Sequence, residues 1–156
     1  MADAVVWGAT TRQGCEGSSP SLRIMKTLLM IKPDATSKKI IGKIISMIEE
    51  AGFEITGIRM KKFSREEAEK FYEVHKEKPF FNELIDFITS GYVVGIRIEG
   101  ENVVEKIRSF IGSTDPKKAE KGTIRNLFGE SITKNVVHAS DSIENAQREL
   151  KFFFED

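Results

Sequence analysis

The fold is decided first by residues 27–52, TLLMIKPDATSKKIIGKIISMIEEAG, which contain the first strand and the first helix that the sequence predicts. The uninterrupted apolar run Leu28 to Ile31 predicts a short buried strand, which stops at Pro33 because proline has no N–H for a sheet ladder. A helix is predicted next, with Gly52 at its C-terminal cap. It is indicated by isoleucines at helical spacing, at positions 40, 41, 44, 45 and 48.

Downstream of this unit, strand and helix patterns alternate along the chain. In chain order they are a strand at 53–63, a helix opened by a capping box of Ser64 and Glu67, a helix at 82–89 after Pro79, a strand at 92–98, a helix at 102–111, a strand at 136–139 and a helix from about 143 capped by Asp141 or Ser142. Residues 112–134 have no regular pattern, and an irregular segment of this length inside a compact domain is usually functional.

The order of elements predicts an α+β fold. We expect a sandwich of ferredoxin-like type, with an antiparallel four-stranded sheet and helices packed on it. Because this architecture serves many functions, the function has to be argued from the site.

Length and composition set further limits. With 156 residues the chain has the size of one domain. Lysine plus arginine and aspartate plus glutamate both total 24, so we expect neither specific nucleic-acid binding nor a membrane surface as partner. The single cysteine, Cys15, excludes an internal disulfide framework, and no apolar run is long enough to span a bilayer; a cytoplasmic protein is expected.

The first 24 residues differ from the rest. Residues 1–24 show neither strand nor helix periodicity and are rich in small and polar residues, so a disordered N-terminal extension is predicted there. They lack the basic start and apolar core of a signal peptide. The folded domain is predicted over residues 25–156.

The densest polar cluster is NVVHASDS, residues 135–142. Alternation along an ideal strand puts Val136 and His138 on the same face, close to the turn into the last helix. A histidine there is either a core residue satisfied by a backbone partner or a nucleophile. Glu149, on the following helix, is a candidate to bind one ring nitrogen, which would fix the tautomer and leave the other nitrogen to attack.

Cations suited to phosphate chemistry occur in three other segments. Lys32 ends the first strand, Arg108 lies on a predicted helix and Arg125 lies in the irregular segment, with Thr114 as a neutral donor. A phosphoryl acceptor needs such groups because negative charge spreads over the transferred oxygens. Each alone is equally explained as a solvated surface residue, or for Thr114 as a turn residue. No Walker loop, GxGxxG turn or HxxE-type metal spacing is present.

Most of these residues lie in segments that together resemble the nucleoside diphosphate kinase family. The segments are TLLMIKPDA (27–35), FYEVHKEKPFFNELI (71–85), SGYVVG (90–95), Gly112 to Pro116, GTIR (122–125) and NVVHASDS (135–142). They follow the family's order and spacing over residues 25–156. The NxxH(G/A)SD element is specific, whereas KPD and GTIR are weak singly.

The resemblance implies a ping-pong transfer of the γ-phosphate from a nucleoside triphosphate, typically ATP, to a nucleoside diphosphate. His138 would carry the phosphate between the two half-reactions. Mg²⁺ would be the cofactor, held mainly through the nucleotide phosphates and not by a protein metal site. A homo-oligomer built from dimers, either a hexamer or a tetramer, would be the working form.

The resemblance also implies roles for individual residues. Lys32 would contact the sugar hydroxyl and the transferring phosphate, and Asn135 would hold the 3′-hydroxyl. The phosphates would be clamped by Arg108, Thr114 and Arg125. Tyr72 would neighbour the histidine, Glu149 with Ser140 would orient its ring, and Phe80 would stack on the base. Stacking tolerates any base because every base has a π-face. Phe80 is alternatively a core residue, and alternation with Phe81 predicts that one of the two is buried. His75, the other histidine, lies in a charged helix end, where we expect a solvated or capping residue.

The sequence departs from the family pattern in three places. Ala139 stands where glycine is more frequent, which adds a methyl group beside the nucleophile, and Tyr92 stands where proline is usual. The chain ends at Asp156, without the C-terminal tail by which many members reach neighbouring subunits. The dimer is expected to persist, and the choice between hexamer and tetramer stays open.

Two other functions are compatible with the fold. A catalytically silent scaffold protein would lack a site residue, and none of the family's residues is missing here. An RNA-binding or small-molecule regulatory module is the second. An RNA-binding sheet would interleave basic and aromatic residues, but the strand at 92–98 offers only Tyr92 and Arg97.

Overall fold

The computed structural model describes residues 24–154, and the predicted extension 1–24 lies outside this range except for Ile24. That residue already belongs to the first strand, where it pairs with Glu101. The first strand therefore includes one residue that the sequence pattern assigned to the extension.

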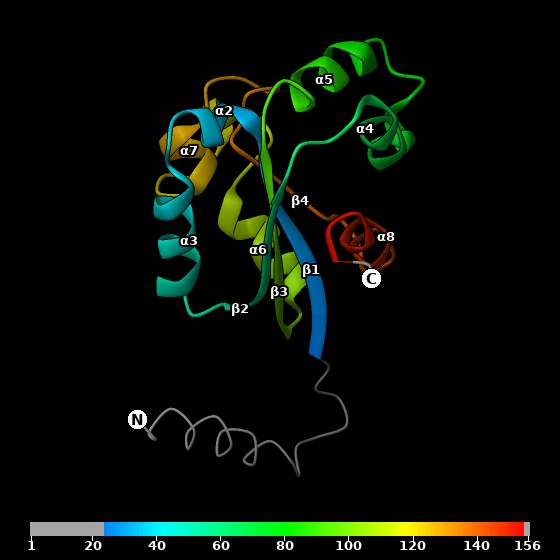
Figure 1. The fold of residues 1–156 in the computed structure, drawn as a ribbon. Coiled ribbons are helices and arrows are strands. Elements are labelled where there is room, and N and C mark those ends of the chain that lie inside the picture. The colour runs from blue at the N-terminus through cyan, green and yellow to red at the C-terminus, as the bar shows by residue number, and fades with distance from the viewer. Residues whose placement is uncertain (1–23, 155–156) are drawn as a thin grey trace.

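Four strands form a single antiparallel sheet in the order β2-β3-β1-β4. They are β1 (Ile24–Ile31), β2 (Glu54–Lys61), β3 (Val93–Glu101) and β4 (Val137–Ala139). Helices cover both faces of the sheet, as Figure 1 shows. This is the predicted α+β sandwich with an antiparallel four-stranded sheet, which is confirmed.

The apolar run at the start of the chain is explained by its place in the sheet. β1 lies between β3 and β4, and its alternate residues pack on opposite faces. Leu29 and Ile31 join one core, beneath helices α3 (Ile41–Glu50) and α6 (Val103–Ile111). Leu28 and Met30 join a second core on the opposite face. A strand buried on both faces has no polar positions, which is why this run shows no alternation.

The second core is aromatic and lies beneath α4 (Arg65–Phe71), α5 (Phe81–Ile88) and α8 (Ile143–Phe154) (Figure 1). Phe153 of α8 lies flat against β3 at Gly95, where an added Cβ would come within 2.5 Å of the ring. The glycine is thus required by close packing. Helix α8, which follows the histidine strand, is held to the sheet by this contact.

Most of the predicted elements are present. The capping box of Ser64 and Glu67 opens α4 with both of its hydrogen bonds, and Ser142 accepts from the backbone of Asn145 at the start of α8. The prediction missed α2 (Pro33–Ser37) and, within the segment expected to be irregular, α7 (Ile124–Phe128). Two short 3₁₀ turns complete the set, η1 (Glu73–His75) and η2 (Pro116–Lys118).

Candidate active site

His138 lies at the centre of β4, opposite Met30 of β1. Its Nε2–H donates to the Oε1 atom of Glu149 at 2.9 Å, and the hydroxyl of Ser140 donates to the same oxygen at 2.7 Å. An ionised carboxylate only accepts hydrogen bonds, so this contact places the hydrogen on Nε2. The other ring nitrogen, Nδ1, keeps its lone pair and makes no hydrogen bond within residues 24–154.

Glu149 reaches the ring because α8 follows β4 after a turn of only a few residues. The carboxylate is 5% exposed, and the hydroxyl of Ser140 behind it is fully buried. A buried carboxylate with two hydrogen-bond donors keeps one orientation, and it holds the imidazole in one orientation as well.

The backbone before His138 departs from an ideal strand. Val136 has φ 79°, in the left-handed region that β-branched residues rarely adopt. Its N–H donates to Asp34 at 3.0 Å, and its carbonyl accepts from the N–H of Lys32 at 2.8 Å. Val136 therefore packs in the same core as Val137, and the predicted alternation that placed it on the face of His138 is wrong.

Two aromatic rings pack edge-on against the imidazole. The ring centroids of Phe71 and Tyr72 lie 5.2 and 5.7 Å from that of His138. The Tyr72 hydroxyl is buried and has no hydrogen-bond partner within residues 24–154. Burial, reinforced by the charge of Glu149, raises the pKa of Tyr72, so its hydroxyl is neutral and able to donate to a ligand.

Lys32, at the end of β1, is 5% exposed, and its Nζ donates to the Oδ1 atom of Asn135 at 2.7 Å. Burial lowers the pKa of Lys32 to about 8, with a smaller contribution from Arg125 that Asp34 opposes. Burial raises the pKa of Asp34, against the effect of Lys32. A buried ammonium group is costly in free energy, and an anion that binds beside it lowers that cost.

Arg125 is tied directly to the histidine strand. Its guanidinium donates to the carbonyl of Gly112 at 3.0 Å and to that of Val137 at 2.8 Å, and its buried Nε has no partner within the described chain. Burial and then the neighbouring Arg108 lower the pKa of Arg125 to about 10. Two guanidinium groups on the wall of one cavity favour an anion between them.

One cavity of about 510 Å³ brings most of the predicted residues together. Its walls include Lys32, Tyr72, Phe80, Arg108, Thr114, Arg125, His138 and Glu149. Asn135 and Ser140 lie behind the wall. Asn135 is 2% exposed and bridges Lys32 to the carbonyl of Thr114 through its carboxamide. Asn135 thus fixes the position of the Lys32 ammonium group.

The alternation predicted that one of Phe80 and Phe81 is buried, which is wrong, because Phe81 is only half-buried. Phe80 is 46% exposed and lines the cavity, so its interpretation as a core residue is wrong, whereas Phe81 packs against the aromatic core. Around Phe80 the wall is apolar and contains Val74, Leu84 and Ile132, three residues that the sequence interpretation did not include.

His75 is also part of this cavity, and the expectation of a solvated side chain is wrong. The 3₁₀ turn η1 folds it back over α4, where its ring lies 6.3 Å from Tyr72 and 6.1 Å from Phe80. Its Nδ1 is buried without a partner within residues 24–154, and burial followed by Lys78 lowers its pKa. Its position in FYEVHKEKPFF, three residues after Tyr72 and before the phenylalanine pair, was the available signal.

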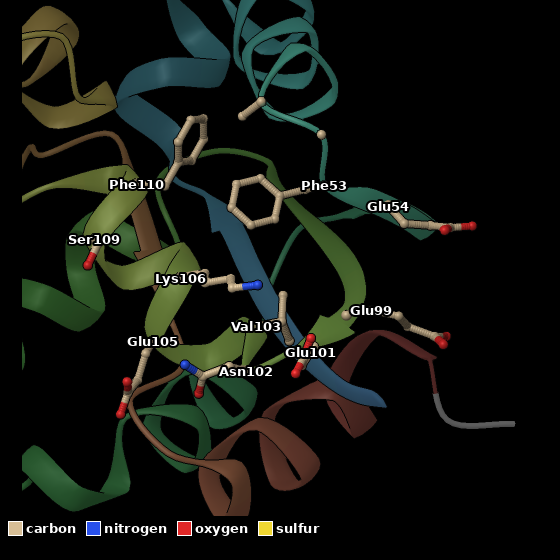
Figure 2. A pocket seen from close by; sticks show the side chains of 13 residues that line it. Phe53, Glu54, Glu99, Glu101, Asn102, Val103, Glu105, Lys106, Ser109 and Phe110 are labelled. Carbon is tan, nitrogen blue, oxygen red and sulfur yellow. The ribbon is translucent and has the colours of Figure 1, made fainter. Parts of the chain in front are cut away.

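A larger cavity, of about 860 Å³, lies elsewhere, at the ends of β2 and β3. Figure 2 shows its residues: the rings of Phe53 and Phe110 meet edge to face, while Glu54 and Glu99 point one way and Glu105 another. No histidine lines it, and no three ligands within the described part of the chain converge as a metal ion would need. The chemistry therefore belongs to the cavity around His138.

Comparison with known proteins agrees with the geometry. The family model of nucleoside diphosphate kinase matches residues 25–156. A nucleoside diphosphate kinase of a Nitratiruptor species is 56% identical over 129 residues, which are 83% of this chain and 94% of that protein. One from Saccharolobus solfataricus is 53% identical over 130 residues, with the same shares of 83% and 94%.

Solved structures show the same fold. The crystal structure of the Aquifex aeolicus nucleoside diphosphate kinase superposes with a TM-score of 0.82 at 43% identity, covering 85% of this chain and 96% of that one. That of Encephalitozoon cuniculi gives 0.82 at 37% identity, covering 85% and 90%. Together with the histidine, carboxylate and cations gathered in one cavity, these matches show that the chain belongs to the nucleoside diphosphate kinase family.

Proposed function

We propose that the protein moves the γ-phosphate of a nucleoside triphosphate, typically ATP, onto a nucleoside diphosphate through a phosphohistidine at His138. The observation that carries this proposal is the state of the ring: Nε2 is held by Glu149, while Nδ1 has a free lone pair in a cavity lined by Lys32, Arg108 and Arg125. A neutral imidazole held this way is a nucleophile near pH 7.

In the first half-reaction Nδ1 attacks the terminal phosphorus, the N–P bond forms, and the bond from phosphorus to the bridging oxygen breaks. Positive charge that develops on the ring is balanced by Glu149 through Nε2–H. Lys32, Arg108 and Arg125 neutralise the oxygens of the transferring group, and Tyr72 can donate its hydroxyl hydrogen to them. The second half-reaction reverses these steps with a different diphosphate.

The walls of the cavity suit both parts of a nucleotide. Phe80, with Val74, Leu84 and Ile132, offers apolar and aromatic surface for a base, and Lys32, Arg108 and Arg125 offer positive charge for the phosphates. Asn135, behind the wall, holds Lys32 where we propose that the sugar hydroxyl binds, and its amide donates to the carbonyl of Thr114.

Mg²⁺ fits this site as an ion carried on the phosphates. The carboxylates on the wall are Glu149, which is engaged by His138 and Ser140, and Asp141, which accepts from Asn145, so neither is set up as part of a metal cage. Mg²⁺ bound to the phosphate oxygens would neutralise part of their negative charge, in addition to Lys32, Arg108 and Arg125.

We also propose a homo-oligomer built from dimers, hexameric or tetrameric. β2 is an edge strand of the sheet, and Ile58 and Met60 on it are each 51% exposed. An exposed apolar edge strand in a protein of this size favours burial against a second copy.

Within residues 24–154 no helix is long and apolar enough to cross a membrane.

The test of the transfer mechanism is brief exposure to γ-³²P-labelled ATP. The protein should take up an acid-labile, base-stable label, as expected of a phosphoramidate, and should pass it to any added nucleoside diphosphate. His138→Ala should lose labelling and transfer but keep nucleotide binding, whereas the matched variant His75→Ala should still be labelled. Acid-stable labelling would assign the phosphate to Ser140, and transfer that persists in His138→Ala would refute the mechanism.

A further inference from the structure

A second cavity, of about 660 Å³, adjoins the one that contains His138. Arg108, Thr114 and Arg125 line both cavities. Beyond these three residues the second cavity is formed by the end of α6 and by the segment up to α7, with Ser109, Ser113, Lys118 and Glu120 on its walls. Ile111 and Gly112 complete its walls, and the proposed nucleotide transfer uses the three shared residues and none of these other six.

The second cavity carries excess positive charge. Three cations, Arg108, Lys118 and Arg125, stand against one carboxylate, Glu120, and no carboxylate in residues 24–154 lies within ion-pair distance of any of the three. Hydroxyl groups of Ser109, Ser113 and Thr114 add neutral donors. Unpaired cations with hydroxyl donors are the chemistry that binds phosphate oxygens.

The two cavities differ in what surrounds the shared cations. The apolar wall at Phe80, Leu84 and Ile132 belongs to the first cavity alone, whereas the second has no aromatic residue on its walls. A ligand that extends from His138 into the first cavity meets a surface suited to a base. One that extends into the second meets cations, hydroxyl-bearing residues and a single apolar side chain, Ile111, with no ring on which a base could stack.

We propose that the second cavity binds the tail of a linear inorganic polyphosphate, which serves as an alternative phosphoryl donor to His138. The terminal phosphate lies at His138 between Arg108 and Arg125, and the following phosphates extend toward Lys118. Arg125 connects the two positions, because its guanidinium contacts the carbonyl of Val137, the residue before the histidine.

The chemical step is the same exchange at phosphorus. The lone pair of Nδ1 forms the N–P bond, the bond from the terminal phosphorus to the bridging oxygen breaks, and the electron pair leaves on the shortened chain. Tripolyphosphate thus gives phosphohistidine and pyrophosphate, and a nucleoside diphosphate then takes the phosphate. No oxidant or additional reactant is needed. The inference rests on His138 as phosphate carrier, as proposed above.

The probe is tripolyphosphate labelled with ³²P in its terminal phosphates, mixed with Mg²⁺ and the full-length protein freed of nucleotide. An acid-labile label that passes to GDP is expected. Lys118→Ala should slow labelling by tripolyphosphate roughly three- to tenfold, because an exposed charge-assisted contact is lost, and should leave labelling by ATP unchanged. Glu120→Gln, which removes the one carboxylate, should speed labelling by tripolyphosphate. Phe80→Ala should weaken ATP use only.

Parallel reactions with γ-³²P ATP separate the two proposals. Labelling by ATP with none by tripolyphosphate would overturn this inference and leave the nucleotide transfer intact. Labelling by tripolyphosphate that Lys118→Ala does not change would also overturn it, since the tail would then lie elsewhere. Failure of both donors would refute the phosphohistidine itself, and this inference with it.

Discussion

Glu149→Gln isolates the charge that holds the catalytic ring. The substitution keeps the size and shape of a side chain that is 5% exposed, so the fold and thermal unfolding should be nearly unchanged. What changes is the acceptor, because the charged carboxylate that accepts hydrogen bonds from both His138 and Ser140 is replaced by a neutral amide. The variant therefore tests electrostatics at Nε2 without creating a cavity.

The magnitude follows from the type of hydrogen bond. A bond to a charged group stabilises by about 1.5 to 3 kcal/mol and a neutral one by about 0.5 to 1.5 kcal/mol, so the difference is about 1 to 2 kcal/mol. Since the ring gains positive charge as the N–P bond forms, this difference is felt in the transition state. At about 1.4 kcal/mol for each factor of ten, phosphorylation of His138 should slow about 5- to 30-fold.

The assay is rapid-quench measurement of phosphohistidine formation from ATP in a single turnover. Ser140→Ala is the matched variant, because it removes the other donor to the same oxygen and leaves the charge in place; it should slow the step by no more than about threefold. The double variant should show coupling, as expected of two groups that share one partner. A rate for Glu149→Gln within twofold of the parent, with nucleotide binding unchanged, would show that the carboxylate does not assist the ring.

Three further outcomes follow from the same structure. Phe80→Ala should weaken binding of all nucleotides by about 1 to 3 kcal/mol with little change in base preference; calorimetry showing selective loss of one base would contradict stacking, and lowered folding stability would return Phe80 to the core. The pKa of Lys32, lowered to about 8 by burial, means that its ammonium charge is lost as pH rises through that value, so kcat/KM should fall above about pH 8. An unchanged fall in Lys32→Arg would assign it to another group. Removal of residues 1–23, which precede the first strand, should leave activity and melting temperature unchanged, and a large loss of either would show that the segment is structural.

Much of the fold could be predicted because local signals agreed with tertiary packing. The fully apolar run of β1 and the capping box at Ser64 and Glu67 need no knowledge of distant residues, and both are found as predicted. Helix α7 was missed although Thr123 caps it and accepts from the backbone of Asn126. A helix of a single turn shows too few positions for a periodic pattern to emerge.

The site was harder to predict where it depends on contacts between distant segments. The left-handed backbone at Val136 is stabilised by Asp34 and Lys32, which no pattern within NVVHASDS could indicate. His75 was misjudged because its charged neighbours suggested solvent, whereas Tyr72 and Phe80 enclose its ring. The types of residue indicated phosphate chemistry. Which side chains line the same cavity is decided by tertiary packing, which the sequence pattern does not show.

The pairing of β1 with β4 has a consequence for synthesis of the protein. β1 is the first strand to leave the ribosome, yet one of its edges stays open until β4, near the end of the chain, pairs Ala139 with Leu29. An unpaired strand edge is a place where a nascent chain can associate with other chains. The same late event brings His138 to Lys32, so a shortened polypeptide cannot hold nucleotide against the histidine. The strand that covers this edge of β1 and the proposed phosphate carrier are therefore supplied by the same late segment of the chain.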